Sequence, residues 1–154
     1  MKHILFFVFG LCLTFMACSS GKKLHSSVPK QGISGKLLVA SGNHMPMVGA
    51  PPNDPQPLKG TILVYEPTNL SQVTRMGDAP EYTAIHTRQI ASVETDSSGT
   101  FSIALLPGAY SLFVKRNDHY YANLFDNNNN IALYTVEEGK LTTVKITVST
   151  TAVY

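Results

Sequence analysis

The stretch Thr95–Val114, TDSSGTFSIALLPGAYSLFV, predicts two consecutive hairpin turns with a strand between them. Its first turn, Asp96-Ser97-Ser98-Gly99, combines side chains that hydrogen-bond to nearby backbone with a glycine that adopts positive φ at little cost. Apolar residues then alternate with small or polar ones at Phe101, Ile103 and Leu105, which is the period of a strand with one buried face. Leu106-Pro107-Gly108 ends this strand, because proline has no N–H to give to a ladder.

A second alternating run follows the Pro-Gly turn, with apolar side chains at Tyr110, Leu112 and Val114. Phe113 lies at the intervening position, on the face that the alternation predicts to be the outer one. A large aromatic ring is rarely left fully exposed there, so we expect this outer face to be partly covered.

The pattern Thr-Asp-x-x-Gly-x-Phe (95–101), then Leu-Pro-Gly-x-Tyr-x-Leu-x-Val (106–114), resembles the carboxypeptidase regulatory-like domain. That domain is a small β-sandwich of the transthyretin type, and the resemblance extends from near Gly32 to Val148. Three further segments are similar to a group of small bacterial surface lipoproteins that carry this domain: GNHMP (42–46), YEPTNLSQV (65–73) and YANLFD (121–126). The resemblance implies a fold and a cellular location but no reaction, since function is not inherited from a fold.

The remaining segments also have strand-like patterns, and no window shows a sustained helical period. Besides the two strands of Thr95–Val114, short apolar or alternating runs separated by turn residues are found at 32–39, 61–65, 82–95, 120–125, 131–136 and 144–148. Together these runs indicate about seven or eight short strands, and hence one all-β sandwich over residues 32–154. In Tyr82–Thr95 the alternation changes parity between Ile85 and Ile90, which predicts a bulge or a change of sheet. Thr68–Gln72 predicts one helical turn capped by Thr68 or Asn69.

A long proline-rich segment interrupts this pattern. Ala40–Lys59 contains five of the nine prolines, so it predicts neither a helix nor a central strand. Loops of this length are uncommon in compact domains and often carry function.

The N-terminus predicts export and lipid attachment. Ile4–Phe15 is an apolar run after Lys2, typical of a signal-peptide core and too short to span a bilayer comfortably. Ala17-Cys18 follows and resembles a bacterial lipobox, with Phe15 where leucine or valine is usual. This implies cleavage after Ala17 (signal peptide 1–17) and lipidation of Cys18. The alternative is an ordinary secretory signal with an incidental cysteine.

Residues 18–31 are polar and predict a flexible tether between the lipidated Cys18 and the sandwich. Cys12, the other cysteine, falls in the removed segment, so the exported domain has no disulfide and depends on its core. Ser19 stands where enteric lipoproteins carry aspartate for inner-membrane retention. The resemblance therefore implies a lipid-anchored protein of the outer membrane or cell surface of a Gram-negative bacterium, with the lipid as its membrane partner.

The sequence offers no metal or cofactor site. Asp126, Asn128, Asn130 and Glu137 match four positions of a calcium loop, but the required glycine is Ile131. Intradiol dioxygenases, which share the expected fold, bind iron through two tyrosines and two histidines. His119, Tyr120 and Tyr121 do not reproduce that set, because adjacent strand residues point to opposite faces and no second histidine lies at metal spacing.

No catalytic set is evident either. No free cysteine remains after maturation, no Gly-x-Ser-x-Gly elbow is present, and the C-terminal Tyr-Arg-Gly-Ser of the related hydroxyisourate hydrolases is absent, so we expect no enzyme. The net charge of +2 without a basic stripe argues against nucleic acid.

Recognition is the remaining class of function. We expect a structural or protein-binding module that contacts an envelope protein through the proline-rich segment or an exposed sheet edge. The alternative is a glycan or small-ligand binder using His119, Tyr120, Tyr121 and Asn123, whose rings and amide suit a sugar. Against it, the rings could simply complete the core and the asparagine run 127–130 could be a turn.

Overall fold

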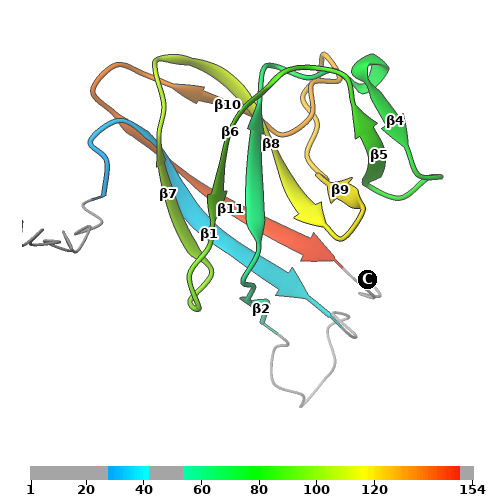
Figure 1. The fold of residues 1–154 in the computed structure, drawn as a ribbon, viewed down its shortest axis with the longest axis horizontal. Helices are drawn as coiled ribbons and strands as arrows, with labels where there is room; N and C mark the ends of the chain where they lie inside the picture. The colour runs from blue at the N-terminus through cyan, green and yellow to red at the C-terminus, as the bar shows by residue number, and fades with distance from the viewer. Residues whose placement is uncertain (1–27, 42–53, 150–154) are drawn as a thin grey trace, which may run out of the picture.

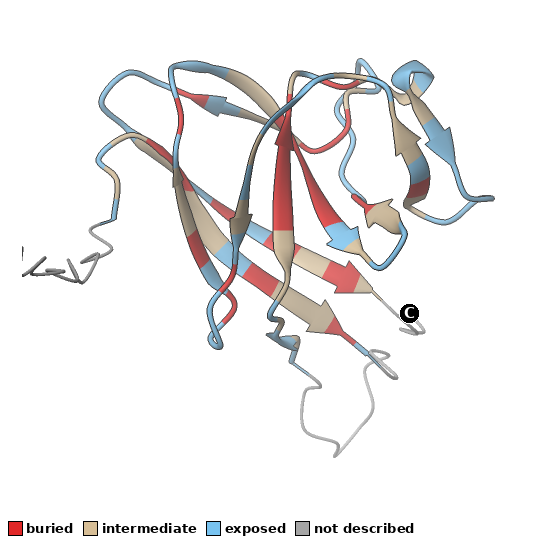
Figure 2. Cartoon of the chain, viewed as in Figure 1, coloured by how far each residue is buried: buried red, intermediate tan, exposed pale blue. Residues whose placement is uncertain are grey.

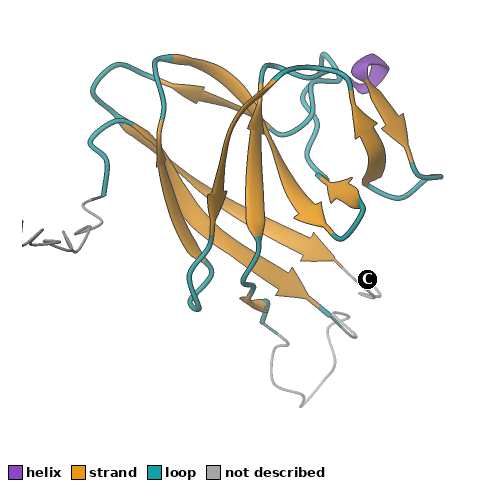
Figure 3. Cartoon of the chain, viewed as in Figure 1, coloured by secondary structure: helices purple, strands orange, loops and turns teal. Residues whose placement is uncertain are grey.

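A computed structural model of the chain describes residues 28–41 and 54–149. This part is all-β, with two sheets packed face to face as a β-sandwich (Figures 1 and 3), so the predicted fold class is confirmed. One short 3₁₀ turn, Leu70–Gln72, interrupts the strands; its N-cap is Asn69, one of the two caps that the sequence offered. The signal peptide, Cys18 and most of the expected tether lie outside the described residues.

The smaller sheet joins the first and last described strands. Its four strands are β1 (Gly32–Ala40), β2 (Gln56–Pro57), β7 (Thr100–Ala104) and β11 (Leu141–Ser149). β1 pairs with β11 in parallel along its whole length, from Gly32 opposite Leu141 to Ala40 opposite Ser149. On its other side β1 pairs antiparallel with β7 and then with β2.

The larger sheet has seven strands. They are β3 (Thr61–Tyr65), β4 (Val73–Arg75), β5 (Glu81–Ile85), β6 (Gln89–Glu94), β8 (Gly108–Arg116), β9 (His119–Tyr121) and β10 (Leu133–Val136). Six follow one another in the order β4-β5-β9-β8-β3-β6, and β10 also pairs with β8. The described residues thus form eleven strands rather than seven or eight, because several are only two to four residues long.

The main core lies between the sheets (Figure 2). β1 contributes Ile33 and Leu37, and β11 contributes Val144, Ile146 and Val148, with the alternation expected of strands that have one buried face. β3 and β8 place Ile62, Val64, Leu112 and Val114 against them from the larger sheet.

A second apolar cluster covers the outer face of the larger sheet. Phe113 is fully buried at 0% exposure, packed edge-to-face against Tyr65 and Tyr82. Ile131 and Ala132, from the segment after β9, close over this cluster. The prediction that the outer face at Phe113 is covered is therefore confirmed, and β3 is buried on both faces as its continuous apolar run indicated.

The change of parity in Tyr82–Thr95 has a larger cause than the predicted bulge or change of sheet. The segment is two strands, β5 and β6, separated at His86–Arg88. Both belong to the larger sheet, but β9, β8 and β3 lie between them. The chain therefore crosses over the sheet, and each strand has its own buried face.

Two turns share one hydrogen-bond pattern, headed by Asp96 and by Asp126. Oδ1 of Asp96 accepts from the backbone nitrogens of Ser98 and Thr100 at 2.8 and 2.9 Å. Oδ1 of Asp126 accepts from those of Asn128 and Asn130, both at 2.8 Å. The fourth residue of each turn has positive φ, 72° at Gly99 and 60° at Asn129. The asparagine run is thus a capped turn, as one of the two interpretations expected.

Candidate functional site

The predicted ligand-binding residues lie on and just after β9, which forms a tight hairpin with β8. Their side chains do not converge. Tyr121 pairs with Val114 in register and faces the core between the sheets, whereas Tyr120 pairs with Lys115 and faces the opposite side. The expectation that adjacent Tyr120 and Tyr121 point to opposite faces is therefore confirmed.

Tyr121 is a core residue at 1% exposure, so its ring has no free face on which a sugar could stack. Its hydroxyl instead contacts β11: the oxygen lies 3.1 Å from the backbone nitrogen of Ser149 and 3.5 Å from the backbone oxygen of Thr147. The interpretation that the rings complete the core describes this tyrosine correctly.

The other two predicted side chains flank the core. Tyr120 is half-buried and packs against the outer cluster that contains Phe113. Asn123 is exposed, and its amide nitrogen lies 3.5 Å from the Thr147 backbone oxygen, the same oxygen that Tyr121 reaches. Both Tyr121 and Asn123 therefore serve to hold the larger sheet to strand β11.

His119 lies between two carboxylates. Its Nε2 is 3.6 Å from Glu81 and its Nδ1 is 3.2 Å from Asp118, with 17% of the side chain exposed. The hydrogen bond from His119 lowers the pKa of Asp118 below its usual range. Within residues 28–41 and 54–149 no group of three or more His, Cys, Asp or Glu side chains could hold a metal ion. The Asp126 carboxylate, once matched to a calcium loop, is used to cap its own turn.

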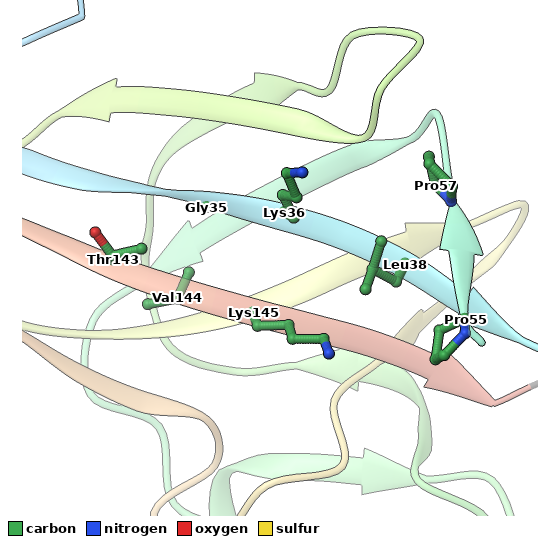
Figure 4. A pocket seen from close by; sticks show the side chains of 8 residues that line it. All are labelled: Gly35, Lys36, Leu38, Pro55, Pro57, Thr143, Val144 and Lys145. Carbon is green, nitrogen blue, oxygen red and sulfur yellow. The ribbon is translucent and has the colours of Figure 1, made fainter. Parts of the chain in front are cut away.

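The structure shows a groove that the sequence did not predict, on the smaller sheet (Figure 4). It has a volume of about 630 Å³ and is open to solvent. Its lining comes from β1, β11 and the segment at β2: Gly35, Lys36, Leu38, Pro55, Pro57, Thr143, Val144 and Lys145. Leu38 and the two prolines supply an apolar floor at one end.

Two lysines give the groove its charge. Lys36 and Lys145 are directly opposite in the β1–β11 register. Figure 4 shows Lys36 extending to the β7 side of β1, whereas Lys145 lies along β11. Lys36 has an acidic neighbour, since its charge helps to lower the pKa of Asp96, although hydrogen bonds from Ser98 and Thr100 lower it more. Lys145 forms no ion pair with any described residue.

The groove borders an open strand edge. β11 pairs with β1 on one side, and no described strand pairs with its other side. The Thr147 oxygen and Ser149 nitrogen that contact Tyr121 point to that open side, and residues two apart in a strand direct their backbone groups alike. Thr143 and Lys145 therefore present backbone N–H and C=O groups to the open edge, beside the groove.

Local sequence signals could have found part of this site. The sequence alternation predicts that three side chains of the groove point outward, because they alternate with core residues: Lys36, Thr143 and Lys145. The sequence does not predict that they lie close together, because this depends on the parallel pairing of the first and last strands, which no local pattern specifies.

No protein-family model, no curated protein and no solved structure matches this chain. The resemblance to the carboxypeptidase regulatory-like domain therefore stays a prediction. In the described part of the chain no helix is long and apolar enough to cross a membrane.

Proposed function

We propose that this protein is a lipid-anchored, non-enzymatic binding module of the bacterial envelope. It recognises an extended segment of another envelope protein at the open edge of β11, with the partner's side chains in the adjoining groove. The observation that carries the proposal is this combination of a strand edge that no described strand covers and a groove on the same strand.

An open strand edge favours a protein partner over a small molecule. Unpaired backbone N–H and C=O groups along a strand form a ready template for one more strand, and natural proteins usually protect such edges. Binding modules use them to add a peptide as an extra strand, whose backbone provides affinity while neighbouring pockets select alternate side chains. Here Thr143 and Lys145 supply the edge, and Leu38, Pro55 and Pro57 supply the apolar pocket.

The anchor is supported by the sequence. Cys18 follows a signal-peptide core, and the polar segment after it predicts only a short tether. The sandwich would therefore remain near the membrane that holds its lipid. The expected location is the outer membrane or the cell surface.

Intact mass and membrane fractionation test the anchor. We expect the membrane-extracted protein to begin at Cys18 and to carry the mass of a diacylglyceryl group, and we expect a Cys18→Ala variant to lack both. An unlipidated chain in the soluble periplasmic fraction would contradict the anchor.

Site-specific photo-crosslinking tests the edge. A photo-reactive amino acid at Thr147, in cells that express the full chain, should capture one protein; the same group at exposed Asp78, in a turn of the other sheet, should not. Thr143→Pro removes an N–H from the open edge and should abolish this adduct, whereas Thr143→Ala keeps the N–H and should retain it. An adduct that survives Thr143→Pro would rule out strand addition.

A second candidate function is supported by the volume of the groove alone. About 630 Å³ lies within the range of pockets that take small ligands. In that case Thr143→Pro would leave binding unchanged while substitution of Leu38 would weaken it.

A further inference from the structure

A second hollow, separate from the groove, lies at the end of the sandwich where β1 ends and β3 begins. It has a volume of about 240 Å³. It is lined mainly by Val39, Leu58, Lys59, Gly60, Arg116 and Asn117. The residues come from both sheets and from the segment between β2 and β3, so the hollow lies at the rim where the two layers meet.

Arg116 gives this hollow an unusual electrostatic character. It follows Val114 at the next inward position of β8, so its side chain enters the space between the sheets. Its Nη1 is buried and has no hydrogen-bond partner among the described residues. A guanidinium remains charged at any physiological pH, and a buried charged donor without a partner is strongly unfavourable. Such a group calls for an explanation, and a role in binding an anion is one.

The charges around the hollow are predominantly positive. Lys59 lines it together with Arg116. Neither cation forms an ion pair with a described residue. Glu81 pairs with His119, and Glu94 lines a neighbouring hollow that Lys59 also lines.

We propose that Arg116 and Lys59 bind a small oxyanion, a phosphate or a carboxylate group, in this hollow. The planar guanidinium presents two parallel N–H donors that match the oxygens of either group, and such charge-assisted pairs are the strongest hydrogen bonds in proteins. Lys59 adds a flexible point charge from the segment just before β3, the strand that pairs with β8. The site is distinct from the β11 edge, so it does not depend on the proposed protein partner.

Thermal unfolding of the mature chain in defined anions tests this site. Sodium phosphate and sodium acetate are the probes, and sodium chloride at equal ionic strength is the reference. At an anion concentration ten times its Kd, a ligand that binds only the folded state lowers the unfolding constant about 11-fold. We expect this stabilisation in the wild-type chain with at least one of the two probes, and we expect Arg116→Gln to remove it.

Phosphate also stabilises proteins by exclusion from their surfaces, so a matched control is required. Arg88→Gln removes the same charge from an arginine whose side chain is 74% exposed, and it should leave the response unchanged. If Arg116→Gln does not fold, Lys59→Gln replaces it and should weaken binding by at least about 10-fold, which corresponds to one lost hydrogen bond to a charged group.

The two probes separate the possible sources of the anion. A response to phosphate alone indicates a phosphorylated ligand or lipid headgroup, and a response to acetate alone indicates a peptide carboxylate. Equal responses of the wild-type and Arg116→Gln chains to both anions would overturn the proposal. That result would leave the proposed function standing, because the crosslink at β11 is measured independently.

Discussion

The Tyr121 hydroxyl lies 3.1 Å from the backbone nitrogen of Ser149, so a core tyrosine of the larger sheet contacts the last strand of the smaller sheet. The same oxygen lies 3.5 Å from the carbonyl oxygen of Thr147. This contact joins the two layers at the end of β11 and satisfies part of its otherwise open edge.

Tyr121→Phe should therefore weaken the end of β11 without changing the fold. The ring stays in the core, and only the hydroxyl bonds are lost, which costs about 1 kcal/mol of unfolding free energy. Amide hydrogen exchange should accelerate at Ser149 and Val148 more than in β3. Uniformly faster exchange across both sheets would show that Tyr121 supports the whole core and not this strand end.

Two glycines with similar backbone conformations should lose different amounts of unfolding free energy when each is replaced by alanine. Gly99 and Gly139 have φ of 72° and 67°. A Cβ at Gly99 would lie 2.3 Å from the Leu37 carbonyl oxygen, whereas a Cβ at Gly139 would meet nothing within 4 Å. Gly139→Ala should cost about 1–2 kcal/mol for the left-handed backbone alone. Gly99→Ala should cost clearly more, because the turn must also move away from β1. Equal losses in urea unfolding would mean that the turn at Gly99 relaxes freely.

The two Asp-headed turns should contribute to acid sensitivity. Hydrogen bonds from Ser98 and Thr100 lower the pKa of Asp96, and those from Asn130 and Asn128 lower the pKa of Asp126. A carboxyl group with a lowered folded-state pKa stabilises the protein above its unfolded pKa, which is about 3.9. This contribution is lost as the pH falls through the folded-state pKa.

The double variant Asp96→Asn/Asp126→Asn should accordingly lose less stability between pH 5 and pH 2 than the wild type. Asparagine keeps an acceptor oxygen for each turn, so the fold should persist. Urea midpoints measured across this range provide the test. Asp118 and Glu137 also have lowered pKa values, so some acid sensitivity should remain. Asp78→Asn, in an exposed turn, is the control; a double variant with the wild-type pH profile would exclude these turns as the source.

Lys145 should show opposite effects on stability and on binding. It lies directly across from Lys36, and like charges in this position repel. Lys145→Glu should raise the unfolding free energy by about 0.2–1 kcal/mol at low salt, and less at high salt. If the groove serves an acidic partner segment, the same change should reduce the β11 crosslink, while Lys145→Gln should have an intermediate effect. A gain in stability with an unchanged crosslink would assign Lys145 to edge protection alone.

The features that the sequence predicted correctly are local. The turns at Asp96 and Pro107, the cap at Asn69 and the covered face at Phe113 each depend on a few neighbouring residues and on strand alternation. The prediction that these two turns close hairpins is wrong, because β7 pairs with β1 in the smaller sheet while β6 and β8 belong to the larger sheet. Such patterns report the direction of a side chain and the chemistry of a turn.

The features that the sequence did not predict depend on long-range pairing. The Ile85 to Ile90 segment changes parity because it crosses the larger sheet, and the same change would have arisen from a bulge. The groove exists because β1 lies parallel to β11. The sequence leaves open whether Tyr121 faces the core or a ligand, because an aromatic residue in a short strand has the same local pattern in both positions.

The parallel pairing of β1 with β11 also constrains when the domain can fold. Gln31, at the start of β1, bonds through its side-chain oxygen to the Gly139 backbone nitrogen, 108 residues later in the chain. Because the chain is synthesised from its N-terminus, β1 becomes available first and β11 last. During that interval β1 lacks the strand with which it makes its longest pairing, and its apolar side chains lack much of the core against which they pack.

Closing so long a loop late makes folding slow compared with helical domains of equal size, and an unpaired strand is a site of self-association. A chaperone that shields extended apolar segments would therefore be most needed by this protein before Leu141–Ser149 emerges. Truncation just before Leu141 should trap the chain in that aggregation-prone state.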